Sequence, residues 1–110
     1  KRLSYSPVEQ AMKILDDEID CFHSLNSLSK RIFIHPVYLA RAFKLKNGIT
    51  IGEYQLKQKL SNAIFLLLNS ALSISDISFK NGFYDDAHFI RNFKSRYAIS
   101  PHQFRLLAKS

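Results

Sequence analysis

Apolar residues recur at intervals of three and four along most of the chain, which is the spacing of one face of an α-helix. The first run follows Ser6-Pro7 and puts five apolar side chains on one side: Val8, Ala11, Leu15, Ile19 and Phe22. The longest run extends from about residue 51 to residue 69, with Leu56, Leu60, Ala63 and Leu67 directed inward. The pattern predicts an all-α protein.

Helix boundaries are marked by residues that cap a first turn or fit within it. These residues are, in chain order, Ser6-Pro7, Ser24, Pro36, Ser73, Asp85 and Ser100-Pro101. Asn47-Gly48 and Gly82 are typical of helix ends. Together the signals predict about seven helices. Two short pairs, near residues 24–47 and 74–97, have the form of a helix, a tight turn and a helix.

The second helix of each pair repeats one sequence pattern. "HPVYLARAFKLKNGIT" begins at His35, and "DDAHFIRNFKSRYAIS" begins at Asp85, fifty positions later. At that offset Arg41 matches Arg91, Phe43 matches Phe93, Lys44 matches Lys94, Ile49 matches Ile99, Thr50 matches Ser100 and Tyr54 matches Phe104. Upstream, Leu25, Leu28 and Ser29 match Ile74, Ile77 and Ser78 after a one-residue shift in the turn. The chain therefore contains two copies of one helix-turn-helix unit, joined by a long helix.

Charge is distributed unevenly along the chain. The net charge is +7 and the isoelectric point is about 9.7. Residues 1–23 carry three basic and five acidic side chains, whereas residues 24–110 carry thirteen basic and four acidic ones. This asymmetry favours an anionic partner on one face of the protein. It predicts that the acidic face of the first helix points away from that partner.

Length and composition bound the organisation of the protein. The chain has 110 residues, 46% of them hydrophobic, with three glycines and three prolines, which favours one helical domain. The longest apolar run, residues 63–68, is far shorter than the roughly 18 residues that a membrane span needs. The single cysteine, Cys21, cannot form an internal disulfide, which fits the cytoplasm. Because the first residue is Lys1 and not methionine, we expect a piece of a longer protein.

The segment "ISDISFKNGFYDDAHFIRNFKSRYAISPHQFR" resembles the second helix-turn-helix signature of AraC/XylS-type transcription regulators. The family pattern falls on Ile77-Ser78, Gly82-Phe83, Phe89, Arg91, Phe93-Lys94, Ser100-Pro101 and Phe104-Arg105. Ser78, Ala98 and Lys59 stand where the family commonly has alanine, glycine and arginine, and Phe33 stands in a turn where a small residue is common. The resemblance implies a seven-helix DNA-binding domain that activates or represses transcription. It also implies two recognition helices in successive major grooves of double-stranded DNA.

Candidate DNA-binding residues follow from the stripe of each recognition helix opposite Leu39, Phe43, Phe89 and Phe93. The expected base readers are Val37, Ala40 and Arg41 in the first unit and Asp86, Ala87, Ile90 and Arg91 in the second. A guanidinium can donate twice to guanine, an aliphatic side chain can pack on a thymine methyl, and a carboxylate can accept from cytosine. Lys44 and Lys94 are expected to contact phosphates. For Ile90 the alternative is that its side chain is half-buried against the neighbouring helix and contacts no base.

The linker helix and the two halves fit this interpretation. A helix of some 18 residues is roughly 27 Å long, close to the ~34 Å between successive major-groove faces once the width of each unit is added. We expect one DNA-binding domain over residues 1–110. Its parts are a first half over 1–50, the linker helix over 51–69 and a second half over 70–110. RNA polymerase and an N-terminal regulatory domain outside this sequence are the further expected partners.

Other functions explain less of the sequence. Asp85, Asp86 and His88 could bind a cation or act as acid and base, but no further ligand or nucleophile accompanies them. Asp85 has a simpler role as a helix cap, and negative charge at Asp86 suits the first turn of a helix. We therefore expect no enzyme, no metal site and no cofactor. A basic protein-interaction module without DNA readout is the alternative, and it leaves the duplicated Phe-x-Arg-x-Phe-Lys pattern unexplained.

Overall fold

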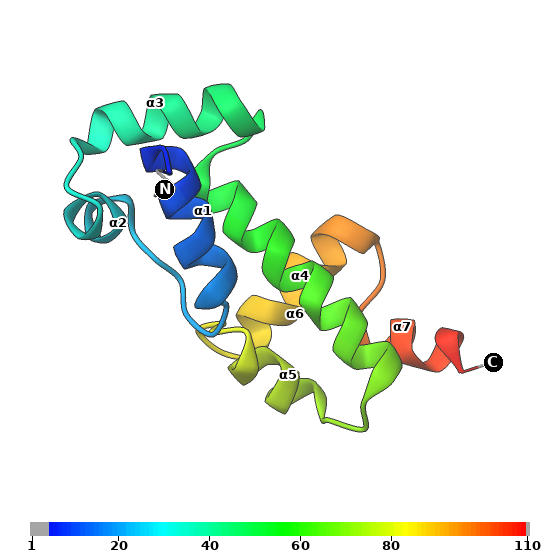
Figure 1. Cartoon of the computed structure of the whole chain (residues 1–110). Coiled ribbons are helices and arrows are strands. Elements are labelled where there is room, and N and C mark those ends of the chain that lie inside the picture. The colour runs from blue at the N-terminus through cyan, green and yellow to red at the C-terminus, as the bar shows by residue number, and fades with distance from the viewer. Residues whose placement is uncertain (1–4, 110) are drawn as a thin grey trace. The chain divides into compact units, whose positions relative to one another are not determined.

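The computed structural model describes residues 5–109, and in that range it contains seven α-helices and no β-strand (Figure 1). The helices are α1 (Pro7–Asp17), α2 (Leu25–Arg31), α3 (Pro36–Asn47), α4 (Ile51–Asn69), α5 (Ile74–Lys80), α6 (Asp86–Tyr97) and α7 (Pro101–Ala108). The all-α prediction is confirmed. Residues 1–4 and 110, which the expected domain and the charge count include, lie outside the described residues.

The expected helix caps are present. The side chains of Ser24, Ser73 and Asp85 each accept a hydrogen bond from a backbone amide in the first turn of α2, α5 and α6. Ser6 and Ser100 form full capping boxes with Glu9 and Gln103. These interactions are local, which is why the sequence alone located them.

The first helix is shorter than its apolar pattern predicts. It ends at Asp17, so Ile19 and Phe22 do not continue its apolar face, and Phe22 is exposed. The next residue, Glu18, accepts two hydrogen bonds from the Arg31 guanidinium, both of 2.8 Å. This long-range contact holds the chain as it leaves the helix, and helical periodicity carries no information about it.

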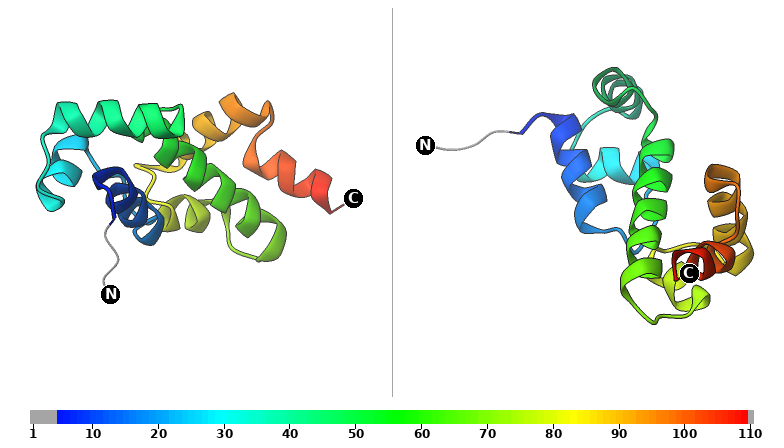
Figure 2. Two further views of the ribbon diagram at one scale, coloured as in Figure 1. Left: turned by 45° about the horizontal axis from the view of Figure 1, so that its top comes forward. Right: turned by 90° about the vertical axis from the view of Figure 1, so that its right-hand side faces the viewer.

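The described chain divides into two compact units that interleave in sequence. The first consists of residues 5–18 and 22–57, and the second of residues 19–21 and 58–109. The first contains the helix-turn-helix pair α2 and α3, and the second contains the pair α5 and α6. α4 is one uninterrupted helix of 19 residues to which both units contribute (Figure 2).

Each unit has its own apolar core. In the first, α1 contributes Val8, Ala11 and Leu15, which pack with Leu28, Leu39, Phe43 and Ile51. In the second, the buried apolar residues are Leu60, Ala63, Leu67, Ile77, Phe83, Phe89 and Phe93. Phe89 and Phe93 lie 5.9 Å apart between ring centroids, and Phe93 lies 5.9 Å from Phe104. The predicted inward stripe of both recognition helices is confirmed, because all four of its residues are fully buried: Leu39, Phe43, Phe89 and Phe93.

Each helix-turn-helix copy places two residues in the left-handed backbone region. One lies in the turn, where φ is 58° at Phe33 and 76° at the matching Gly82. The other follows the recognition helix, where φ is 78° at Gly48 and 72° at the matching Ala98. Each copy therefore has one glycine and one residue with a side chain at these two positions. Ala98 adopts the conformation that glycine reaches with the least strain.

Replacing Ala98 with glycine is expected to raise the free energy of unfolding by about 0.5–1 kcal/mol. A left-handed conformation costs an L-residue roughly 1–2 kcal/mol, and the greater entropy of glycine in the unfolded chain removes about half of that gain. Urea denaturation followed by circular dichroism measures the change. Ala71→Gly is the control, because Ala71 is exposed and its φ is not positive, so this variant should lose stability. Equal losses in both variants would contradict the assignment of strain to residue 98.

Candidate nucleic-acid interface

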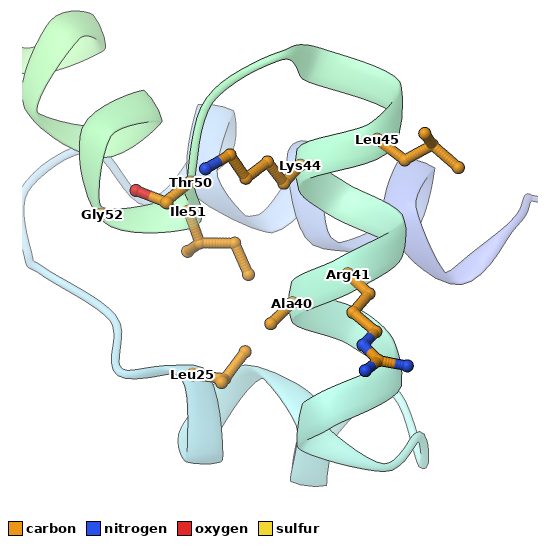
Figure 3. Close-up of a pocket in the computed structure, with 8 residues that line it drawn as sticks. All are labelled: Leu25, Ala40, Arg41, Lys44, Leu45, Thr50, Ile51 and Gly52. Carbon is orange, nitrogen blue, oxygen red and sulfur yellow. The ribbon is translucent and has the colours of Figure 1, made fainter.

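The outer face of α3 carries the residues predicted for the first unit. Val37 is 55% exposed, Arg41 and Lys44 are exposed, and Ala40 is half-buried. Figure 3 shows Arg41 and Leu45 directed away from the start of α4, whereas Lys44 reaches toward Thr50. The Arg41 side chain thus lies on the side of α3 that faces away from the start of α4, and the Lys44 side chain lies between α3 and the start of α4.

An open apolar recess of about 720 Å³ lies beside α3 in the first unit (Figure 3). It is lined by Leu25, Ala40, Arg41, Lys44, Leu45, Thr50, Ile51 and Gly52. At its edge Thr50 and Glu53 form a reciprocal cap, with hydrogen bonds of 2.8 and 3.1 Å. Hydrogen bonds from the backbone amide and the side chain of Thr50 to the Glu53 carboxylate, together with the positive charge of Lys44, lower the pKa of Glu53. Lys44 is therefore close to an acidic group at one end of the recess.

The outer face of α6 carries the residues predicted for the second unit. Asp86, Ala87, Arg91 and Lys94 are exposed, and Ile90 is 36% exposed. The Asp86 carboxylate accepts a hydrogen bond from the Ser75 hydroxyl of α5. This carboxylate therefore already has a fixed partner within its own unit.

The three residues considered for catalysis have separate local roles. The Asp85 carboxylate accepts a hydrogen bond of 2.7 Å from the His88 backbone amide, as a helix cap does. The ring nitrogen Nδ1 of His88 accepts from the Tyr84 backbone amide at 3.2 Å, and the ring packs edge-on against Phe83. With Asp86 held by Ser75, the three side chains do not converge on a common point.

Some basic residues in the first unit serve structure. Arg31 donates to both carboxylate oxygens of Glu18, and His23 Nε2 lies 2.8 Å from Glu18 Oε1. The hydrogen bonds from Arg31 and then His23 lower the pKa of Glu18 to about 2. Gln55 of α4 joins the same region, because its side chain pairs with the backbone of His23 at 2.7 and 2.8 Å. No sequence pattern predicts this network, because its members come from four separate segments.

Two basic residues in the second unit are likewise structural. Lys59 is buried, and its ammonium donates to the backbone carbonyls of Ile19 and Cys21. Burial lowers the pKa of Lys59, while the nearby Cys21 and Asp20 act in the opposite direction. The Arg105 guanidinium donates to the carbonyl groups of Leu67 and Ser70, both at 3.2 Å, at the end of α4. Some basic side chains of this unit therefore form internal hydrogen bonds to backbone carbonyl groups, and others lie on the exposed face of α6.

Comparison with known proteins identifies the family. Residues 28–106 match the family of helix-turn-helix domains. The chain belongs to the AraC-type helix-turn-helix family. Members of this family are DNA-binding domains of transcription regulators, so the prediction that the chain is not an enzyme is confirmed.

Three similar proteins illustrate the match. The Msm operon regulatory protein of Streptococcus mutans serotype c is 32% identical over 89% of this chain and 35% of its own length. The C-terminal domain of AraT, a response regulator from Geobacillus stearothermophilus, is 29% identical with a TM-score of 0.89, covering 97% of this chain and 88% of that one. The DNA-binding domain of the transcriptional factor AdpA, solved with a target DNA, shares the fold at 17% identity, with a TM-score of 0.88 and coverage of 94% and 93%. The AraC-type domain spans about a third of the length of the curated relatives it matches.

Membrane insertion has no candidate among the described helices. None of the helices within residues 5–109 combines the length and the apolar character that a membrane crossing requires.

Proposed function

We propose that this AraC-type domain binds double-stranded DNA as part of a transcription regulator, with α3 and α6 reading adjacent major grooves. The observation that carries the proposal is the duplicated pair Arg41 and Arg91. Each is exposed on a recognition helix whose opposite side holds a fully buried phenylalanine, Phe43 or Phe93. The solved AdpA complex, in which a domain of the same fold is bound to its target DNA, supports this function. Residues 1–110 then act as one domain with two reading halves and the linker helix.

Each exposed residue has a distinct role in the proposal. Arg41 and Arg91 donate to guanine, because a guanidinium matches the two acceptors of guanine in the major groove. Lys44 and Lys94, one turn further along their helices, contact phosphates. The remaining proposed contacts are apolar at Val37, Ala40, Ala87 and Ile90, and polar at Asp86. With one carboxylate oxygen engaged by Ser75, Asp86 retains a second oxygen that can accept from a cytosine amino group.

We propose that the regulator works in the cytoplasm with RNA polymerase and with an N-terminal regulatory domain. The relatives support the further domain, since the chain matches about a third of their length and the similar AraT structure is a C-terminal domain of a response regulator. Asp16 and Asp17 are exposed on α1, and although Lys13 pairs with Asp17 at 3.2 Å, α1 has three acidic side chains and one basic one, which suits a protein partner better than DNA. Cross-linking probes at Asp17 should therefore react with protein partners and not with a bound duplex.

Arginine and lysine variants are expected to weaken DNA binding in different ways. Arg41→Ala or Arg91→Ala should cost about 1–3 kcal/mol on the preferred site and relax the preference at one base pair. Lys44→Ala or Lys94→Ala should weaken binding to all sequences and reduce the log–log salt slope by about 0.9 per lost phosphate contact. Selection from random duplexes, followed by titrations at several salt concentrations, measures both effects.

Arg96→Ala is the matched control, because Arg96 is exposed on α6 but lies beside Tyr97, away from the proposed reading stripe. Its sequence preference should equal that of the unchanged protein. Circular dichroism must show native helix content in all variants. If both arginine variants at positions 41 and 91 keep their full preference, the base-reading residues lie elsewhere.

A further inference from the structure

The two recognition helices begin with different side chains at matched positions. In α3 the first turn carries Val37 and Tyr38, each 55% exposed. At the same positions of the repeat, α6 carries Ala87 and His88. At these two positions α3 therefore has two large, mostly apolar side chains, whereas α6 has one methyl group and an imidazole.

The imidazole of His88 does not replace the exposed ring of Tyr38. It is half-buried, it accepts a hydrogen bond from the Tyr84 amide, and it packs on Phe83 at 5.3 Å between ring centroids. Tyr84 belongs to the turn that is one residue longer in the second copy. The longer turn thus supplies the group that holds His88 against its own unit.

Exposed apolar side chains at the start of a recognition helix can make apolar contacts with one kind of group on the base edges of DNA. The N-terminal residues of such a helix approach the base edges most closely. The C5-methyl of thymine is the apolar group that the base edges present in the major groove. From these exposures, and on the basis of the proposed DNA binding, we infer that the first unit reads a thymine-rich box through Val37 and Tyr38. The second unit depends more on the polar contacts of Arg91.

The second unit keeps a smaller apolar contribution. Ile90 is 36% exposed and matches Ala40, which is half-buried beside the recess of the first unit. One partly exposed isoleucine can cover one thymine methyl, whereas Val37 and Tyr38 offer two separate contacts. Removal of thymine methyls therefore affects the first box more than the second.

Replacing thymine with deoxyuridine in one box at a time tests the inference. This change removes the methyl groups and leaves every hydrogen-bonding group in place. Loss of one buried methyl should weaken binding about fourfold. We expect a loss of at least about tenfold in the first box, from two methyls, and of no more than about fourfold in the second. Equal sensitivity of the two boxes, or an unaffected first box, would overturn the inference.

Protein variants assign the effect to its residues. Val37→Thr keeps the shape of the side chain but replaces a methyl with a hydroxyl, and Tyr38→Ala removes the ring. Both should weaken binding to the thymine form of the first box and leave the affinity for the deoxyuridine form nearly unchanged. Ala87→Val should give the second box a new thymine preference of about fourfold.

Leu45→Ala is the control, because Leu45 is 90% exposed on α3 but lies in its last turn, away from the base edges. Its sensitivity to deoxyuridine should match that of the unchanged protein. The outcomes separate the two proposals. If no duplex is enriched in the selection, DNA reading itself is wrong. If boxes are enriched but neither responds to deoxyuridine, only the methyl contacts are wrong.

Discussion

Replacing Gly82 with alanine is expected to lower the free energy of unfolding by about 3 kcal/mol or more. Gly82 has φ of 76°, a region that costs a residue with a side chain roughly 1–2 kcal/mol. A Cβ at this position would also lie 2.5 Å from the carbonyl oxygen of Asp20 and 2.7 Å from the Cα of Cys21. Both neighbours are backbone atoms, so the clash can be relieved only by moving a chain segment.

Gly48→Ala is the matched control for this variant. Gly48 has φ of 78°, and a Cβ there would meet no atom within 4 Å. Only the conformational cost remains, so the expected loss is about 1 kcal/mol. Urea denaturation of the two variants measures the difference. If both variants lose a similar amount of unfolding free energy, the close contact between residue 82 and the backbone of residues 20–21 does not explain the need for glycine.

Replacing Lys59 with methionine is expected to lower the free energy of unfolding by about 2–4 kcal/mol. Methionine keeps most of the apolar volume but leaves the carbonyl groups of Ile19 and Cys21 without their charged donor. An unpaired buried carbonyl costs about 1–3 kcal/mol, and the relief of burying no ammonium offsets part of the loss. Thermal and urea unfolding, monitored by the helix signal, measure the change.

Two further variants make this result specific. Lys57→Met, on the same helix but exposed, should change the stability by no more than about 0.5 kcal/mol. Lys59→Arg restores the residue type that is frequent in the family and should keep most of the stability, since a guanidinium can donate to both carbonyl groups. A Lys59→Met protein as stable as the unchanged one would refute the role given to the ammonium.

Helix boundaries were predictable because their signals are local. Ser24, Asp85 and Ser100 bond to amides three residues away, and sequence spacing reveals such pairs. The buried phenylalanines of α3 and α6 followed from helical periodicity and from the fifty-residue repeat. The end of α1 did not, because Glu18 is held by Arg31, thirteen residues further along the chain.

The candidate interface was predictable in outline. Periodicity identified the outer stripes of α3 and α6, on which the exposed residues Arg41 and Arg91 lie. It could not show that Ser75 holds Asp86 or that the Tyr84 backbone amide donates to the ring of His88. It also could not separate basic residues by environment. Lys59 counts toward the positive charge of the sequence, yet its ammonium is enclosed by backbone carbonyl groups.

The interleaving of the two units limits how the domain can be recombined. Residues 19–21 belong to the second unit, although α1 and α2 of the first unit flank them in sequence. Consider a chimera that joins the first 57 residues of one relative to the remaining residues of another. Residues 19–21 then come from one relative, whereas the rest of their unit comes from the other. Gly82 and Lys59 of one parent would then contact the backbone of residues 19–21 from the other parent, which evolved with different residues around it. Exchange of DNA preference between relatives is therefore better achieved by grafting the outer stripe of one recognition helix than by swapping whole halves.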